Sequence, residues 1–235
     1  MQDVSPSGVE LCLRTAANYV VAAGLVWSNH RLRAMDLDDM QDRLSVLDAS
    51  GGDVVRRLVW ELRGEELSSG DRTDLYRVGS LFEHAVDRLA TAGRVARDYG
   101  LVVLSDELCV LIDLVVDCAW ITAQSLPPLG VSGVVRPYWV EVGDLAVRAE
   151  VAFDVLSARH PVDSIFLSAN GAIRAIGTEL LAAIRNLDSA GRTMELLISR
   201  RDAALVSPRP FSGLATRGPA SGSRVCTAAI DITWI

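Results

Sequence analysis

Three carboxylates in the first half of this sequence have types and spacings that would suit a cation site. Asp53 follows a Gly-Asp step and lies 30 residues before Glu83 and 34 residues before Asp87. Two acids four positions apart share one face of a helix. If the helices that carry Asp53 and the Glu83/Asp87 pair are antiparallel neighbours, their oxygens could hold magnesium, manganese, calcium or iron.

An incomplete copy of the same arrangement of acids occurs in the second half of the sequence. Asp144, again after a glycine, lies 31 residues before Ala175 and 35 residues before Glu179. Alanine stands at 175 where the first copy has Glu83, so the full acid pair is present only in the first copy. The repeat predicts a duplicated helix pair, with Asp144 and Glu179 as a second and weaker candidate cluster.

An alternative interpretation needs no metal. Glu83 and Asp87 would then be ordinary solvated helix residues, with Arg56 and Arg88 as their ion-pair partners. Another acid pair at the same four-residue spacing, Asp113/Asp117, could flank a polar groove or a metal, or line the exposed side of its helix. Glu150 and Asp154 have this spacing too, which leaves the register of the second copy ambiguous between them and Asp144.

Composition limits the kinds of function that this chain can have. Half of its 235 residues are hydrophobic, which suffices for a sizeable core, and the net charge is −7. All 23 basic residues are arginine and they form no basic block, which argues against nucleic acid as a partner. The four cysteines (Cys12, Cys109, Cys118 and Cys226) form no CxxC motif and are predicted to be buried thiols. No signal peptide or membrane span is predicted, which favours a cytoplasmic location.

The pattern of apolar residues predicts an all-α protein. Helices are expected at about 9–33, 38–66, 71–98, 105–125, 138–158 and 164–204, with Asp36 or Asp38 capping the second. The clearest apolar stripe steps by three and four through Leu75, Val78, Phe82, Ala85, Leu89, Ala92 and Ala96. The adjacent glycines 51 and 52 within the second helix cost about 1 kcal/mol each relative to alanine, so some specific reason for the pair is expected.

The predicted domain organisation is one helical domain over 1–206 and a tail over 207–235. A Gly/Val linker at 129–137 divides the domain into halves of about 9–128 and 129–206, and we expect two antiparallel bundles that share a long central helix. Pro, Gly and Ser accumulate in the tail, which predicts disorder or loose packing.

Enzymatic motifs are missing from the sequence. It contains no glycine-rich phosphate loop, no nucleophile elbow and no Glu-x-x-His pair of the di-iron type. Three histidines leave little material for acid-base chemistry. We therefore expect a protein that is not an enzyme.

One segment resembles a known family, the PhoU-like putative phosphate-transport regulators that accompany Pit-type phosphate transporters. The similarity is clearest where an acidic helix with a Gly-Asp step leads through a short loop to a helix with an acid-x-x-x-acid pair and a final Tyr-Gly: LSVLDASGGDVVRRLVWELRGEELSSGDRTDLYRVGSLFEHAVDRLATAGRVARDYGL. It extends over about residues 9–126. The second half follows only through GDLAVR, Leu156, the His160-Pro161 turn and Glu179.

The resemblance implies a six-helix fold of two three-helix bundles, surface metal clusters, homo-oligomers, and regulation of phosphate uptake by contact with the transporter at the inner face of the membrane. By position, it implies Asp53, Glu83 and Asp87 as a first metal cluster and Asp144 and Glu179 as a second, for a divalent or ferric ion. Alanine or valine stands at three places where the family usually has glutamate: Ala49, Val140 and Ala175.

Two other functions stay open from sequence. The chain could be a metal store or sensor unrelated to phosphate, or an interaction scaffold that binds no metal.

Overall fold

The computed structural model describes residues 7–32, 35–126, 138–160 and 169–206. These residues form six helices and no strand: α1 (Gly8–Arg31), α2 (Leu37–Gly64), α3 (Ser69–Asp98), α4 (Asp106–Ser125), α5 (Tyr138–Arg159) and α6 (Ala169–Val206). The predicted all-α class is confirmed. The predicted linker, the start of the last predicted helix at 164–168, the tail and Cys226 lie outside the described residues.

Polar side chains at the helix ends determine where the helices begin and end. Ser7, Asp36, Ser68 and Ser105 each accept a hydrogen bond from the backbone N–H three residues ahead, which satisfies an unpaired amide of the first turn. Of the two candidate caps for α2, the structure uses Asp36. At the end of α3 the chain turns at Gly100, whose φ of 62° favours glycine.

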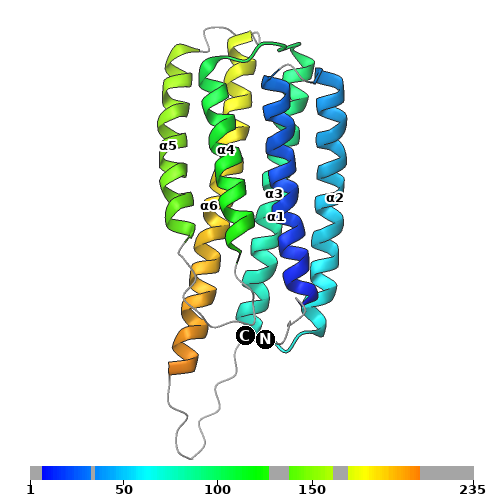
Figure 1. The fold of residues 1–235 in the computed structure, drawn as a ribbon, viewed down its shortest axis with the longest axis vertical. Coiled ribbons are helices and arrows are strands. Elements are labelled where there is room, and N and C mark those ends of the chain that lie inside the picture. Colours follow the sequence, from blue (N-terminus) through cyan, green and yellow to red (C-terminus); the bar gives the residue numbers. More distant parts are fainter. Residues whose placement is uncertain (1–6, 33–34, 127–137, 161–168, 207–235) are drawn as a thin grey trace, which may run out of the picture.

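The six helices pack as two antiparallel three-helix bundles (Figure 1). Helices α1, α2 and α3 pack against one another, and so do α4, α5 and α6. The bundles are joined by α3 against α6, the most extensive helix contact, and by α1 against α4. The prediction of one shared central helix was wrong, because two long antiparallel helices, α3 and α6, occupy the centre.

The predicted apolar stripe of α3 lies in the core, since all seven of its residues are fully buried. In α2, Leu44, Leu58 and Leu62 are buried, whereas Leu47 and Val54 are only partly buried. The buried Trp27 of α1 crosses to α3, where its indole N–H donates to the Leu89 carbonyl at 3.1 Å. One continuous core therefore extends through both bundles.

The second bundle repeats the first at an offset of 98 residues. Ser7 and Ser105 cap the first helix of each bundle. Seven residues of the α3 core have a buried apolar counterpart 98 positions later in α6: Val78/Ile176, Phe82/Leu180, Ala85/Ala183, Val86/Ile184, Leu89/Leu187, Ala92/Ala190 and Ala96/Met194.

Gly79 and Gly177 are also 98 residues apart, and each lies in a close contact with a neighbouring helix. A Cβ placed on Gly79 would meet Leu58, and one placed on Gly177 would meet Leu156. Each glycine lets the leucine of the neighbouring helix approach closely, in α2–α3 and again in α5–α6. The predicted duplication is thus present in the fold, but its offset is 98 residues and not the 91 or 92 residues that separate the acids of the two sequence copies.

Candidate functional site

The predicted first cluster lies on the exposed edge between α2 and α3. Glu83 is partly buried against α2, and its Oε1 would be 3.3 Å from a Cβ at Gly52. Close packing against Glu83 thus gives a reason for a glycine at position 52, whereas nothing lies within 4 Å of a Cβ at Gly51. Asp87 lies one turn further along α3 and makes a 3.8 Å ion pair with Arg94.

Asp53 does not join these two acids. Its side chain is 73% exposed and pairs with Arg56 on its own helix. One residue along a helix is a rotation of about 100°, so when Gly52 contacts α3, Asp53 is directed elsewhere. Arg88, a predicted partner of this cluster, binds Glu179 in the other bundle instead.

The acid of α2 that does lie near Asp87 is Asp48, which the sequence analysis missed. Partial burial raises the pKa of the Asp48 carboxyl, the nearby Asp87 carboxylate raises it further, and Arg94 lowers it. Asp48 precedes Gly52 by four residues and so shares its helix face. That spacing was the available signal, but it required knowing that Gly52 is the contact position.

The second predicted cluster is not assembled. Glu179 accepts a hydrogen bond from Arg88 at 3.1 Å and links the two bundles. Asp144 lies on α5 and lines the same hollow as Asp188, which a Cβ on Gly143 would approach to 3.6 Å. Asp188 and Glu179 are nine residues apart on α6, about 13 Å along the axis.

The other two acid pairs have ordinary surface environments. Asp113 pairs with Arg31 across the two bundles, and Asp117 is exposed. Glu150 accepts two hydrogen bonds of 2.7 Å from Arg185, whose pKa they raise further. In the described part of the chain, no group of three or more His, Cys, Asp or Glu side chains is placed to hold a metal ion.

The described cysteines are unpaired thiols in the helices. Cys12 and Cys118 are buried, as predicted, and Cys109 is partly buried. Burial raises the pKa of Cys118 to about 12, so this thiol is protonated and chemically inert at neutral pH.

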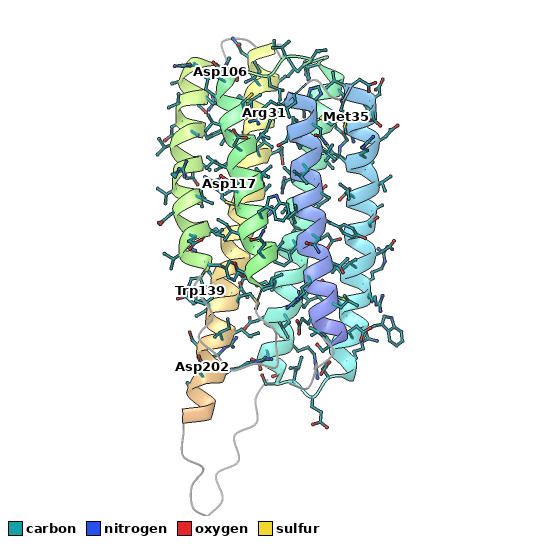
Figure 2. The ribbon with its side chains drawn as sticks, in the orientation of Figure 1. Arg31, Met35, Asp106, Asp117, Trp139 and Asp202 are labelled. Carbon is teal, nitrogen blue, oxygen red and sulfur yellow. The ribbon has the colours of Figure 1, made fainter. Side chains whose placement is uncertain are left out.

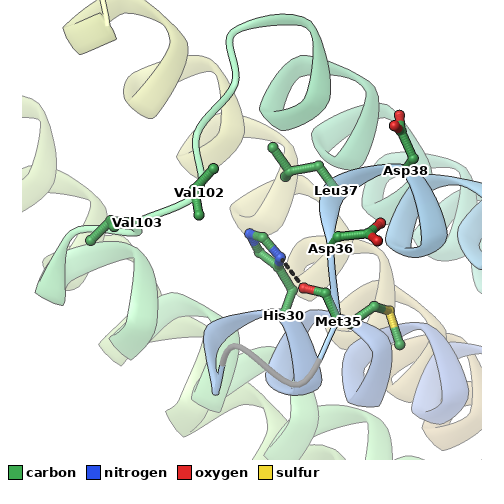
Figure 3. Close-up of a pocket in the computed structure, with 7 residues that line it drawn as sticks. All are labelled: His30, Met35, Asp36, Leu37, Asp38, Val102 and Val103. Carbon is green, nitrogen blue, oxygen red and sulfur yellow. Dashed lines mark hydrogen bonds between the residues drawn. The ribbon is translucent and has the colours of Figure 1, made fainter.

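A pocket of about 610 Å³ lies at the end of the molecule where the α1–α2 and α3–α4 connections meet (Figure 3). Its lining is mainly apolar with two carboxylates: His30, Met35, Asp36, Leu37, Asp38, Val102 and Val103. Val102 and Val103 are exposed valines on a connection rather than on a helix.

His30 holds the two connections together beneath this pocket. Its Nδ1 lies 3.1 Å from the Met35 carbonyl oxygen, and its Nε2 lies 3.4 Å from that of Leu101. The ring is buried and also meets the edge of Trp27. Because its two ring nitrogens lie at carbonyls of different connections, His30 has a structural role here. The pocket therefore offers shape, apolar surface and negative charge.

A second hollow of about 480 Å³ lies between α5 and α6, toward the other end of the molecule. Figure 2 shows this separation, with Met35 beside the first pocket and Trp139 beside the second. Apolar side chains such as Val140, Val147 and Leu196 line the second hollow. Its charged lining is mostly acidic: Asp144, Asp188 and Glu195, with Arg192 paired to Asp188.

Two of the helices, α1 and α4, are long and apolar enough to cross a membrane by length and composition. Both contribute heavily to the core of the bundles, and core helices meet the same criterion.

Fold and site together define an all-α protein of two packed three-helix bundles, with an acidic α2–α3 edge and an apolar end pocket. No protein-family model matches this chain, and no curated protein matches it.

Proposed function

We propose that this protein is a non-catalytic, PhoU-like regulator of inorganic phosphate transport, which acts by contact with a Pit-type transporter at the cytoplasmic face of the membrane. The observation that carries the contact mechanism is the end pocket, where exposed Val102 and Val103 lie beside the Asp36 and Asp38 carboxylates. The duplicated six-helix architecture agrees with what the family resemblance implies.

The chemistry of the pocket suits a cytoplasmic segment of a membrane protein. Such segments carry an excess of lysine and arginine. A basic segment with one apolar side chain would place that side chain against Leu37 and Val102 and its charge near Asp36 and Asp38. Charge complementarity of this kind contributes mainly to specificity and association rate.

Co-purification with the transporter tests this proposal. We expect wild-type protein to co-purify, and Val102→Asp/Val103→Asp to lose most of the transporter while keeping its helical circular dichroism. Asp36→Asn/Asp38→Asn should weaken binding more at low salt than at high salt, and asparagine at 36 retains the helix cap. Val46→Asp is a matched control, because Val46 is also an exposed valine but lies more than two turns from Asp38 along α2.

Phosphate uptake measures the consequence in cells. Deletion of the gene should change uptake, and the Val102→Asp/Val103→Asp variant should behave like the deletion. A wild-type protein that never co-purifies, together with unchanged uptake after deletion, would refute the proposal.

Metal binding is a second candidate function, favoured by the proximity of Asp48 to Asp87. A divalent cation between these carboxylates would replace their repulsion with attraction, with Glu83 nearby on the same edge. Elemental analysis of protein purified without a chelating tag and incubated with excess Mn²⁺ or Fe²⁺ tests it. About one metal per chain, lost in Asp48→Asn/Asp87→Asn, would support it, and less than about one per two chains would argue against it.

A further inference from the structure

The hollow between α5 and α6 combines an apolar lining with an excess of acids. Trp139, Val140 and Leu196 supply apolar surface, and Val140 and Leu196 are 54% and 63% exposed. Three carboxylates and one arginine line the hollow as well, and the arginine is paired with one of the acids at 2.9 Å. The hollow therefore suits an occupant that is both apolar and positively charged.

Two of these acids are available to a cation. Asp144 on α5 and Glu195 on α6 are exposed, and neither makes an ion pair within 4.0 Å among the residues that the structure describes. The side chain of Asp188 is only 16% exposed, and it binds Arg192, whose pKa it raises with a further contribution from Glu195. An arginine of the occupant would therefore pair with Asp144 or Glu195.

The chain itself has a segment of this chemistry directly after α6. Residues 207–235 hold three arginines and a single acid, in a chain whose net charge is −7. Within them, residues 209–217 read RPFSGLATR, so that Phe211 and Leu214 lie between Arg209 and Arg217. Apolar side chains between two arginines match the chemistry of the hollow.

The course of α6 brings this segment within reach of the hollow. Figure 1 shows α6 running past the start of α5 before it ends at Val206. Leu196 precedes Val206 by ten residues, which is about 15 Å along a helix. An extended chain covers about 3.3 Å per residue, so about five residues running back along α6 span this distance. Phe211 is the first apolar side chain after Val206 that can enter the hollow.

We propose that residues 209–217 occupy the hollow of their own chain, with Phe211 packed against Val140 and Leu196. Such a contact needs little intrinsic affinity, because a short link gives an effective concentration of about 1 mM. A dissociation constant of about 0.1 mM between separate molecules would then favour the docked form about tenfold. The inference does not rest on the proposed function, because the end pocket near Met35 lies toward the other end of the molecule.

The positions of the two available acids give the segment a direction. Glu195 lies on the part of α6 nearer to its end, so the first arginine of the segment, Arg209, pairs with it. Asp144 lies at the level where α5 approaches Asp188, about two turns further from the end of α6. It pairs with the second arginine, Arg217. Residues 209–217 therefore run antiparallel to α6.

Hydrogen exchange of the full chain, followed by mass spectrometry, tests the proposal. Amides of residues 209–217 should exchange about tenfold more slowly than those of an unstructured chain of the same sequence. The slowing should be equal at about 1 and about 100 µM protein, because the contact lies within one molecule. A slowing that grows with concentration would overturn the proposal, since the segment would then bind a second copy.

Charge reversal in the hollow tests the role of its acids. Asp144→Arg/Glu195→Arg should reduce the slowing to about twofold or less, because two attractions become repulsions. Asp42→Arg/Asp117→Arg is the matched control. It changes the net charge equally at exposed acids of α2 and α4, and it should keep the tenfold slowing.

Reversal on both sides tests the predicted pairing. Arg209→Glu/Arg217→Glu should lose the slowing alone and should recover most of it when combined with the reversed hollow, because opposite charges then face each other again. A hollow that is merely disrupted would not be repaired by a change in the segment, so failure to recover would refute the ion pairs.

The apolar contact is tested without altering any of the six helices. Phe211→Ser should lose most of the slowing over residues 209–217, whereas Ile230→Ser, the matched control further along the chain, should keep it. Both residues follow α6, so this comparison holds even if the reversed hollow fails to fold. Unprotected exchange of residues 209–217 in the wild-type chain, or equal losses in these two variants, would overturn the proposal.

Discussion

The two three-helix bundles have matching cores and different surfaces. Core positions of α3 recur in α6 at an offset of 98 residues, with apolar residues such as Phe82 and Leu180 at equivalent places. The surface acids do not recur. The counterparts of Glu83 and Asp87 are Leu181 and Arg185. Core packing was therefore retained in both copies, while each surface acquired its own chemistry.

The difference also separates two kinds of surface. The first bundle has an acidic edge with Asp48, Glu83 and Asp87. The second bundle has ion pairs such as Arg185–Glu150 and, on α5, four exposed valines: Val140, Val147, Val151 and Val155. The duplication supports the fold on both sides, but the two halves no longer offer the same binding sites.

The largest expected effect comes from the matched core pair. Phe82→Ala should cost about 3 to 5 kcal/mol and Leu180→Ala about 2 to 5 kcal/mol, because both side chains are fully buried. Since α3 and α6 pack against each other along the centre, both variants should unfold in a single transition at a lower denaturant midpoint. Two separate transitions for either variant would show that the bundles are independent domains.

A smaller effect should distinguish the two close helix contacts. A Cβ at Gly79 would lie 2.4 Å from Leu58 Cδ2, whereas one at Gly177 would lie 3.2 Å from Leu156. Gly79→Ala should therefore be destabilising by about 1 to 2 kcal/mol, because overpacking exceeds the gain in helix propensity. Gly177→Ala should be nearly neutral, within about 0.5 kcal/mol. Urea unfolding measures both, and equal losses would contradict the difference in packing.

Replacing either of the adjacent glycines of α2 by alanine should change the stability of the protein, by different amounts at the two positions. Gly51→Ala should stabilise the protein by about 1 kcal/mol, since alanine is a better helix former and meets nothing within 4 Å. Gly52→Ala should gain less, because the new Cβ would press on Glu83 Oε1 at 3.3 Å. Thermal unfolding compares the two variants. A larger gain at position 52 would show that Glu83 does not lie against Gly52.

The smallest expected effect concerns Asp48, whose counterpart in the second bundle is Ala146. The raised pKa of Asp48 means that the folded protein prefers the protonated acid, so stability from this group is present at low pH and lost as pH rises through the folded pKa. Asp48→Asn should therefore be stabilising at pH 7, by about 0.5 kcal/mol or less.

The pH dependence of the stabilisation by Asp48→Asn shows whether the charge of Asp48 causes it. It should disappear at about pH 3, where Asp48 is protonated in both states, and it should shrink in an Asp87→Asn background. Denaturant unfolding at pH 7 and pH 3 measures it. A gain that is unchanged at low pH would mean that charge is not its cause.

Much of the fold was predictable because helix signals are local. The stripe from Leu75 to Ala96 repeats every three or four residues, and a cap for α2 at Asp36 or Asp38 could be predicted from neighbouring residues alone, although the choice of Asp36 came from the structure. The partners of the acids were not predictable in the same way. Asp53 and Gly52 are adjacent in sequence, and only the contact with α3 shows which of them faces the other helix.

The offset of the repeat illustrates the same limit. Spacings of 91 and 92 residues align Asp53 with Asp144 and Asp87 with Glu179, whereas the core aligns at 98. The difference is about one heptad, which is two helical turns and returns a residue to nearly the same face. Apolar periodicity alone therefore fits both registers, and the acids favoured the wrong one.

The sequence by itself determined that this protein is a chain of helices with a duplicated pattern, because apolar periodicity and capping act within one helix. Only the tertiary structure decided the register between helices, and with it that Asp48 and not Asp53 lies near Asp87. It also decided that the valines of α5 lie outside the core. Both depend on which side of a helix its neighbours cover, and that is a property of packing between segments far apart in the chain.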